Sequence, residues 1–167
     1  MKNVNIDLTK NELIENELIS WSDRLASGIK LIDNQHKQLI DLINQLFILS
    51  TKNEKQEKET IAMNILLFIK YLKIHFATEE KIMLTTKFLS YVEHKRDHES
   101  FILAVLENIH DYEAGKRISL FNFTKFLRDW ILPHITTMDK EYFTYLRKIA
   151  VRKDDGVLSV NLKYKEE

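Results

Sequence analysis

Seven side chains in this chain have the types and spacings that transition-metal ions require. They are five of the six histidines and two carboxylates, namely His36, His75, Glu79, His94, His98, His134 and Asp139. Each lies in an apolar stretch with helical periodicity, where a buried polar ring is costly unless it has a partner. Imidazole suits iron, zinc and copper better than it suits calcium or magnesium. The pattern therefore predicts a two-metal site inside the protein.

Two pairs among these residues are spaced four residues apart. On a helix, His75 would lie one turn from Glu79, and His94 one turn from His98. Each pair can address one metal ion, although a single pair of this kind occurs by chance in many helices. Only the four stretches together favour a metal site over the alternative, which is a set of hydrogen-bonded core histidines without a metal.

The composition favours one all-α domain. The chain has 167 residues, which is enough for a single hydrophobic core. It contains three glycines and one proline, while 44% of its residues are hydrophobic and 30% are charged. Such a chain is rich in helix formers and has few residues that favour turns.

Charge and cysteine content narrow the classes of function. The 25 basic residues balance the 25 acidic ones, so we expect no attraction to nucleic acid or to an anionic membrane. The absence of cysteine excludes disulfides, thiolate-bound zinc and iron–sulfur clusters. The first ten residues lack the apolar core of a signal peptide, and apolar runs such as Ile65 to Ile69 are too short to cross a bilayer. We therefore expect a soluble cytoplasmic protein, and no feature identifies a protein partner.

Four amphipathic stretches must position the seven side chains. The apolar periodicity predicts helices at about residues 29–50, 57–85, 90–112 and 119–150. In the first helix the inward stripe contains Ile32, His36, Leu39, Ile43 and Leu46. Gly115 is placed to end the third helix, and Ser119 is placed to cap the fourth.

Long helices with short connections predict an antiparallel up-down-up-down four-helix bundle. We expect this bundle to comprise residues 29–150. Residues 1–28 are predicted to form an N-terminal arm packed across it, and residues 151–167 a loosely attached C-terminal tail.

The fourth helix contains an irregularity. His134 and Asp139 are five residues apart, which leaves them about 140° apart around an ideal α-helix. Beyond Asp139 the apolar residues follow a new stripe, Tyr142, Leu146 and Ile149. We therefore expect a π-type bulge between His134 and Asp139. Pro133 should add a kink, because it cannot donate a backbone hydrogen bond to the preceding turn.

These residues resemble the hemerythrin family, in particular its single-domain bacterial members, the bacteriohemerythrins. The resemblance runs from about Trp21 to Tyr142. It is carried by Gly28-Ile29, Asp33-Asn-Gln-His36, His75-Phe-Ala-Thr-Glu79-Glu80, the pair His94 and His98, and Trp130 before His134-Ile135. It implies a hemerythrin-like bundle around two non-haem iron ions.

The resemblance also implies a role for each of the seven residues. The ligands of one iron ion would be His94, His98 and His134. The ligands of the other would be His36 and His75. The bridges between the two ions would be Glu79, Asp139 and an oxo or hydroxo group. One coordination position would stay open, and there the family binds dioxygen reversibly.

Further expectations concern residues around the site. The resemblance implies that the open position has apolar walls formed by Phe76, Trp130, Ile131 and Ile135. We expect Met63, Met83 and Met138 to fill the core. Glu80 is expected to be solvated, and His110 to complement the dipole of the third helix near its C-terminus.

The sequence thus predicts an oxygen-binding protein, not an enzyme, that binds dioxygen reversibly for storage, transport or scavenging. The alternatives are a di-iron oxidase or peroxidase, or a sensor that binds iron or nitric oxide. Oxygen-activating bundles typically carry Glu-x-x-His pairs and more carboxylates, whereas this ligand set is rich in imidazole. The same side chains could also bind zinc, manganese or cobalt.

Overall fold

The computed structural model consists of helices joined by short connections. It describes residues 17–52, 57–116 and 119–153, and no strand occurs in these ranges. The α-helices are α2 (Lys30–Ser50), α3 (Lys58–Thr86), α4 (Tyr91–Glu113), α5 (Leu120–His134) and α6 (Lys140–Lys153). The shorter elements are the 3-10 helix η1 (Asp23–Leu25) and the π-helix η2 (Ile135–Asp139). Much of the predicted arm and tail, residues 1–16 and 154–167, lies outside the described residues.

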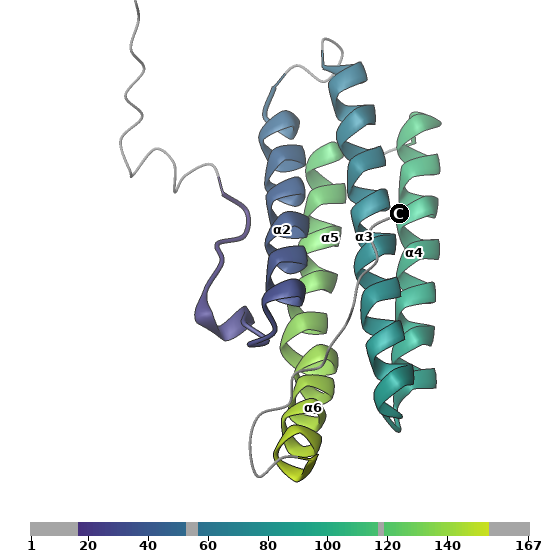
Figure 1. Ribbon diagram of the computed structural model, residues 1–167. Coiled ribbons are helices and arrows are strands. Elements are labelled where there is room, and N and C mark those ends of the chain that lie inside the picture. Colours follow the sequence, from purple (N-terminus) through teal and green to yellow (C-terminus); the bar gives the residue numbers. More distant parts are fainter. Residues whose placement is uncertain (1–16, 53–56, 117–118, 154–167) are drawn as a thin grey trace, which may run out of the picture.

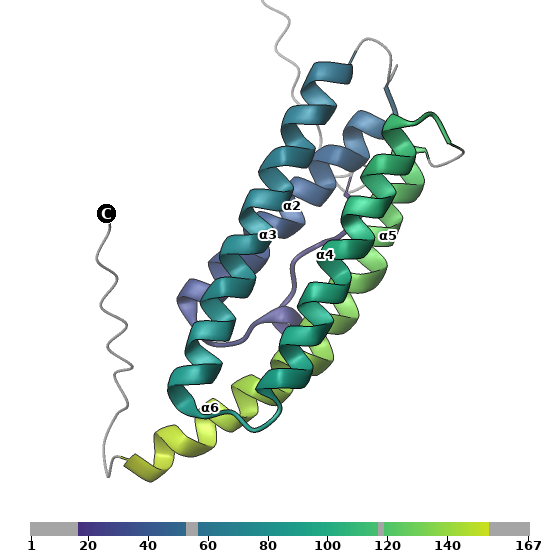
Figure 2. The same cartoon turned by 90° about the vertical axis from the view of Figure 1, so that its right-hand side faces the viewer.

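Helices α2 to α5 form an antiparallel bundle in which helices adjacent in sequence lie side by side (Figure 1 and Figure 2). Helix α6 continues α5 through η2, runs beside the α3–α4 turn and extends past the end of the bundle (Figure 2). The predicted all-α four-helix bundle is confirmed, and each long helix begins and ends within a few residues of its predicted bounds.

Local sequence sets the connection between α4 and α5. Gly115 has a φ of 68°, a left-handed conformation that glycine adopts without strain. There the Lys116 N–H donates to the Asp111 carbonyl at 3.0 Å, which closes the last turn of α4. The Ser119 hydroxyl accepts a hydrogen bond from the Asn122 N–H at 3.2 Å and caps α5. Both predicted signals are confirmed.

The core consists of two apolar clusters separated by a polar layer. One cluster includes Leu39, Leu72 and Ile135. The other, nearer α6, includes Ile32, Ile82 and Tyr142. Along each helix the seven candidate ligands come between residues of the two clusters, and all seven are buried. Because an unsatisfied buried polar group costs about 1–3 kcal/mol, this layer requires a compensating interaction.

Residues 17–27 run across the bundle as the described part of the predicted arm. The buried Asn44 of α2 holds it: its Oδ1 accepts from the N–H groups of Leu18 and Ile19, both at 3.0 Å, and its Nδ2 donates to the Ile19 carbonyl at 2.8 Å. Near the start of α2, one carboxylate oxygen of Asp33 accepts hydrogen bonds from both the N–H and the hydroxyl of Ser27, each at 2.7 Å. These bonds fix the arm along α2, from Asp33 near its start to Asn44 in its second half.

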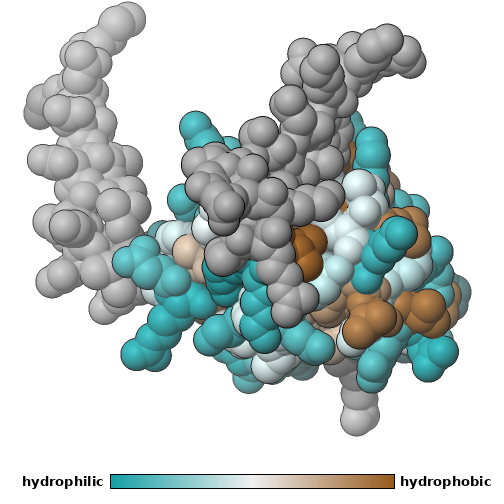
Figure 3. All heavy atoms as spheres, turned by 60° about the horizontal axis from the view of Figure 1, so that its bottom comes forward, coloured by the Kyte–Doolittle hydropathy of each residue, from teal (hydrophilic) through white to brown (hydrophobic). Residues whose placement is uncertain are grey.

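Helix α3 is apolar on its outer face as well as its inner one. Its exposed apolar side chains are Met63, Leu66, Leu67, Ile74 and Leu84. Brown apolar groups stand among teal polar ones on the end of the molecule seen in Figure 3. The prediction that Met63 fills the core is wrong, because its side chain is 59% exposed.

By length and composition, α3 could also cross a membrane. This is weak support for a membrane span, because the core helices of soluble proteins meet the same criterion.

Candidate metal centre

The seven candidate ligands come from every helix of the bundle and meet in its core. Helix α2 contributes His36, whereas α3 and α4 each contribute a pair spaced four residues apart. His134 is the last residue of α5, and Asp139 is the last residue of η2. Each of the seven side chains is at most 4% exposed, so the structure brings together all the residues that the sequence singled out.

The π-helix explains how two residues five apart reach the same centre. Its widened turn absorbs one residue between His134 and Asp139, which an α-helix would leave on different faces. The predicted π-type bulge is thereby confirmed. Pro133 lies one residue before His134 and has no N–H, and its carbonyl accepts from the Thr137 hydroxyl at 2.7 Å. The fourth helix thus departs from the α-helical pattern at this point, and the Pro133 carbonyl oxygen still has a hydrogen-bond partner.

The ligand atoms form two groups that share both carboxylates. Within each group the atoms lie within 4.8 Å of one another. The larger group consists of Glu79, His94, His98, His134 and Asp139. The smaller group consists of His36, His75, Glu79 and Asp139. Each group could hold a metal ion, one with three histidines and the other with two.

Asp139 lies between histidines of both groups. Its carboxylate oxygens are 3.3 Å from His36 Nε2, 3.2 Å from His94 Nε2 and 3.1 Å from His134 Nε2. Nevertheless, neither Asp139 oxygen has a hydrogen bond in the described part of the chain. The nitrogen and oxygen atoms therefore approach each other without pointing at each other, as lone pairs do when they converge on a metal ion.

Glu79 repeats this arrangement. One of its oxygens lies 3.5 Å from the Nε2 atoms of both His75 and His98, and both oxygens lack a hydrogen bond within the described residues. The Nε2 atoms of His98 and His134 are 3.1 Å apart. Two ligands at right angles on one ion, with bonds of about 2.1–2.2 Å, would be about 3.0–3.1 Å apart. The donor set therefore fits two transition-metal ions.

The outward Nδ1 atoms of three histidines contact side chains outside the ligand set. The partners are Glu80 for His98 at 3.3 Å, Asp97 for His134 at 2.9 Å and Gln35 for His75 at 3.4 Å. The expectation that Glu80 is solvated is wrong, because its side chain is only 22% exposed and one oxygen faces the His98 ring. Such partners fix the tautomer and the orientation of a ligand histidine.

The electrostatics of the centre depend on a balance between burial and charge. Burial lowers the pKa of His134, but Asp139 and other carboxylates outweigh it and raise that pKa to about 10. The same balance raises the pKa of His94 to about 9, whereas burial prevails at His75 and lowers its pKa to about 4. Burial raises the pKa of Glu79, but neighbouring histidines lower it to about 2. Without a metal, two protonated rings thus neutralise the two carboxylates.

Aromatic and aliphatic side chains border the histidines. Phe76 stacks on His98 with ring centroids 3.7 Å apart, and its ring is 5.7 Å from that of His75. Trp130 stacks on His134 at 4.2 Å. Phe76 and the two isoleucines expected around the open position, Ile131 and Ile135, are buried in one apolar cluster, and Trp130 packs against it. Phe76 thus touches both groups, and Trp130 touches the three-histidine group.

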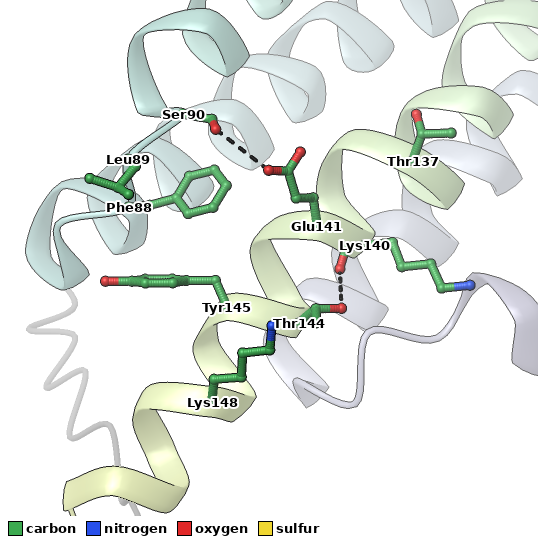
Figure 4. A pocket seen from close by; sticks show the side chains of 9 residues that line it. All are labelled: Phe88, Leu89, Ser90, Thr137, Lys140, Glu141, Thr144, Tyr145 and Lys148. Carbon is green, nitrogen blue, oxygen red and sulfur yellow. Dashed lines mark hydrogen bonds between the residues drawn. The ribbon is translucent and has the colours of Figure 1, made fainter.

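A surface pocket of about 440 Å³ lies beside the centre without including it. It is lined by Phe88, Leu89, Ser90, Thr137, Lys140, Glu141, Thr144, Tyr145 and Lys148, between the α3–α4 turn and the η2–α6 segment (Figure 4). Inside it, the Ser90 hydroxyl donates to Glu141 at 3.5 Å. None of the seven candidate ligands lines this pocket.

The sequence does not predict the roles of Gln35 and Asp97. Each lies next to a predicted ligand in sequence, but its contact crosses to another helix and has no local signature. Tyr142 lies on the predicted inward stripe and is fully buried, and its hydroxyl lacks a hydrogen bond in the described ranges. Burial, with Glu79 and Asp139 nearby, raises the pKa of Tyr142 and keeps the phenol neutral.

Known proteins match the chain over most of its length. The family model described as "Hemerythrin HHE cation binding domain" matches residues 27–146. A bacteriohemerythrin from Pseudomonas aeruginosa is 31% identical over 148 residues, covering 86% of this chain and 94% of that protein. One from Stenotrophomonas maltophilia is 32% identical over 125 residues, covering 75% of this chain and 79% of that protein.

Similarity extends to an animal protein and to a solved structure. A hemerythrin from Phascolopsis gouldii is 27% identical over 122 residues, covering 73% of this chain and 88% of that protein. The crystal structure of a wild-type hemerythrin superposes with a TM-score of 0.69 at 26% identity, covering 76% of this chain and 96% of that chain. With the bundle, the π-helix and the ligand geometry described above, these matches show that the chain belongs to the hemerythrin family.

Proposed function

We propose that this protein binds dioxygen reversibly at a non-haem di-iron centre, for storage, transport or scavenging in the cytoplasm. The metal ligands would be His36, His75, Glu79, His94, His98, His134 and Asp139. When bound, such an iron pair supplies the two electrons that reversible dioxygen binding requires. The relatives support this proposal, because they are bacteriohemerythrins and a hemerythrin.

The inequality of the two ligand groups is the observation that carries the proposal. Three histidines and two shared carboxylates face one metal position, and two histidines with the same carboxylates face the other. With an oxo or hydroxo bridge added, the first position would have six ligands and the second five. The second position would therefore keep one place free for a diatomic ligand.

The chain's own residues provide what reversible binding also requires, which is a dry environment. All seven ligands are buried, and Phe76, Ile131 and Ile135 are each at most 3% exposed. Together with Trp130, these side chains would exclude water and acids that promote irreversible oxidation. The ligand set also has only two carboxylates, whereas oxygen-activating bundles carry more.

The test begins with the full-length protein loaded with iron. Its iron content and visible spectrum are recorded, it is reduced without air, and oxygen is then readmitted. The proposal predicts two irons per chain and a charge-transfer band that forms with oxygen and disappears under argon over repeated cycles. If oxygen instead yields the oxidised form at once, with peroxide released or consumed, the centre acts as an oxidase or peroxidase.

A further inference from the structure

The outward ring nitrogens of the three-histidine group face negative charge. His134 Nδ1 lies 2.9 Å from Asp97 Oδ2, and His98 Nδ1 lies 3.3 Å from Glu80 Oε1. Ionised carboxylates only accept hydrogen bonds, so each of these rings must carry its proton on Nδ1. The Nε2 lone pairs then point inward, toward the shared carboxylates.

The two-histidine group has no such charge. His75 Nδ1 lies 3.4 Å from the Oε1 atom of Gln35, a neutral amide. The orientation of that amide is fixed because its nitrogen donates to the Thr78 hydroxyl at 3.1 Å. His36 Nδ1 is buried and has no hydrogen-bond partner in the part of the chain that the structure describes. The two metal positions thus differ in the charge behind their ligands as well as in the number of histidines.

This difference has a chemical consequence. A carboxylate that accepts a hydrogen bond from the Nδ1–H group makes the imidazole a stronger electron donor through Nε2. A neutral amide in the same place has a smaller effect. A stronger donor stabilises the more highly charged state of a metal ion. We propose that Glu80 and Asp97 are positioning residues that make the metal ion held by three histidines easier to oxidise than its neighbour. This proposal rests on the proposed di-iron function and adds which ion gives up an electron more readily.

The surroundings of the two carboxylates rank their effects. Asp97 has the shorter contact, and its side chain is 40% exposed. Glu80 is 22% exposed, but Lys95 Nζ lies 3.9 Å from its other oxygen and partly neutralises it. Loss of a partner of this kind typically changes metal affinity about 10-fold to 100-fold. We expect removal of the Asp97 charge to have the larger effect, and that of Glu80 a smaller effect in the same direction.

The experiment measures the two one-electron reduction potentials of the iron-loaded, full-length chain, with each step assigned to its ion by Mössbauer spectroscopy. The test variants are Asp97→Asn and Glu80→Gln, which keep shape and remove charge. The matched controls are Asp129→Asn, an exposed carboxylate paired with Arg128, and Glu107→Gln, an exposed carboxylate farther along α4. The reciprocal variant, Gln35→Glu, places a carboxylate behind His75.

Asp97→Asn is expected to raise the reduction potential of the three-histidine ion by at least about 59 mV. For one electron, this corresponds to a tenfold change in the equilibrium constant for reduction of that ion. Gln35→Glu should instead lower the potential of the other ion and narrow the gap. Asp97→Glu, which restores the charge, should return the potential toward its original value. A shift in Asp97→Asn no larger than that in Asp129→Asn would overturn the proposal.

A second readout does not depend on iron or on oxygen. In the zinc-loaded chain, nitrogen-15 NMR should show His98 and His134 protonated at Nδ1, and Asp97→Asn should shift the His134 signal alone. Rings with no Nδ1 proton would contradict the proposal even if a variant folded poorly. Neither readout uses dioxygen. The proposal about Glu80 and Asp97 can therefore fail while reversible oxygen binding is observed, and it can hold when reversible oxygen binding is not observed.

Discussion

The ligand histidines should release two protons per chain when metal binds near pH 7, and a hydroxo bridge formed from water would release one more. In the metal-free protein the pKa of His94 is raised to about 9 and that of His134 to about 10, so both rings are protonated at pH 7. A metal ion needs the Nε2 lone pairs, and both protons must leave when it binds. His75, whose pKa is lowered to about 4, has no proton to lose at this pH.

The size of the effect follows from proton competition. Each displaced proton makes the apparent metal affinity rise about tenfold per pH unit, so the two ring protons alone give about a hundredfold per unit from pH 7 toward pH 9. The metal-free fold should respond in the opposite direction. Its two raised pKa values lie above the ordinary value of 6.5, so their stabilisation is fully present below pH 6.5 and is lost as the pH rises toward 9 and 10.

Zinc serves as the probe, because it binds imidazole and carboxylate without redox chemistry. Proton release is followed during a zinc titration in weakly buffered solution, and calorimetry in two buffers of different ionisation enthalpy provides a second count. His110→Asn is the control, because this exposed ring should not change the count. An affinity that does not vary from pH 7 to pH 9 would show that both rings are neutral in the metal-free chain, contrary to the electrostatics described here.

Three substitutions test other parts of the structure. Asn44→Ala removes three hydrogen bonds to the arm, at about 0.5–1.5 kcal/mol each, so urea unfolding should show a loss of stability of about 1.5–4.5 kcal/mol. As a control, substitution of the exposed Gln45 by alanine (Gln45→Ala) should lower the stability by less than about 0.5 kcal/mol. Equal losses in the two variants would show that the Asn44 hydrogen bonds do not stabilise the arm. Tyr142→Phe removes a buried hydroxyl without a described partner, so the metal-free chain should be as stable or more stable. A clear drop in its midpoint would mean that the hydroxyl has a partner. Phe76→Leu should leave the metal content intact and speed the loss of the oxygen band, and an unchanged rate would remove Phe76 from the proposed wall.

Most of the fold followed from local sequence signals. The stripe through Ile32 and Leu39 placed His36 on the inner face of α2, and Gly115 and Ser119 mark the turn before α5. The irregular spacing between His134 and Asp139 predicted the π-helix, because only a widened turn lets both residues and the next apolar stripe face inward.

Contacts between helices were not predictable in the same way. The sequence predicts a solvated Glu80, but the packing of α3 against α4 turns it toward His98. Asp97 meets His134 across α4 and α5, which no periodicity within one helix reveals. Met63 was assigned to the core because methionine usually fills gaps, but it lies on the outer face of α3. A hydrophobic residue on a helix that is apolar all round gives no signal of which way it points.

X-ray absorption at the iron edge of the loaded full-length protein tests the central claim most directly. That claim is that Glu79 and Asp139 are shared between two adjacent metal positions. It predicts two irons per chain, mainly nitrogen and oxygen neighbours, and an iron–iron scattering shell at about 3.5–4 Å or slightly less. One iron per chain, or two irons without such a shell, would contradict the shared-carboxylate centre.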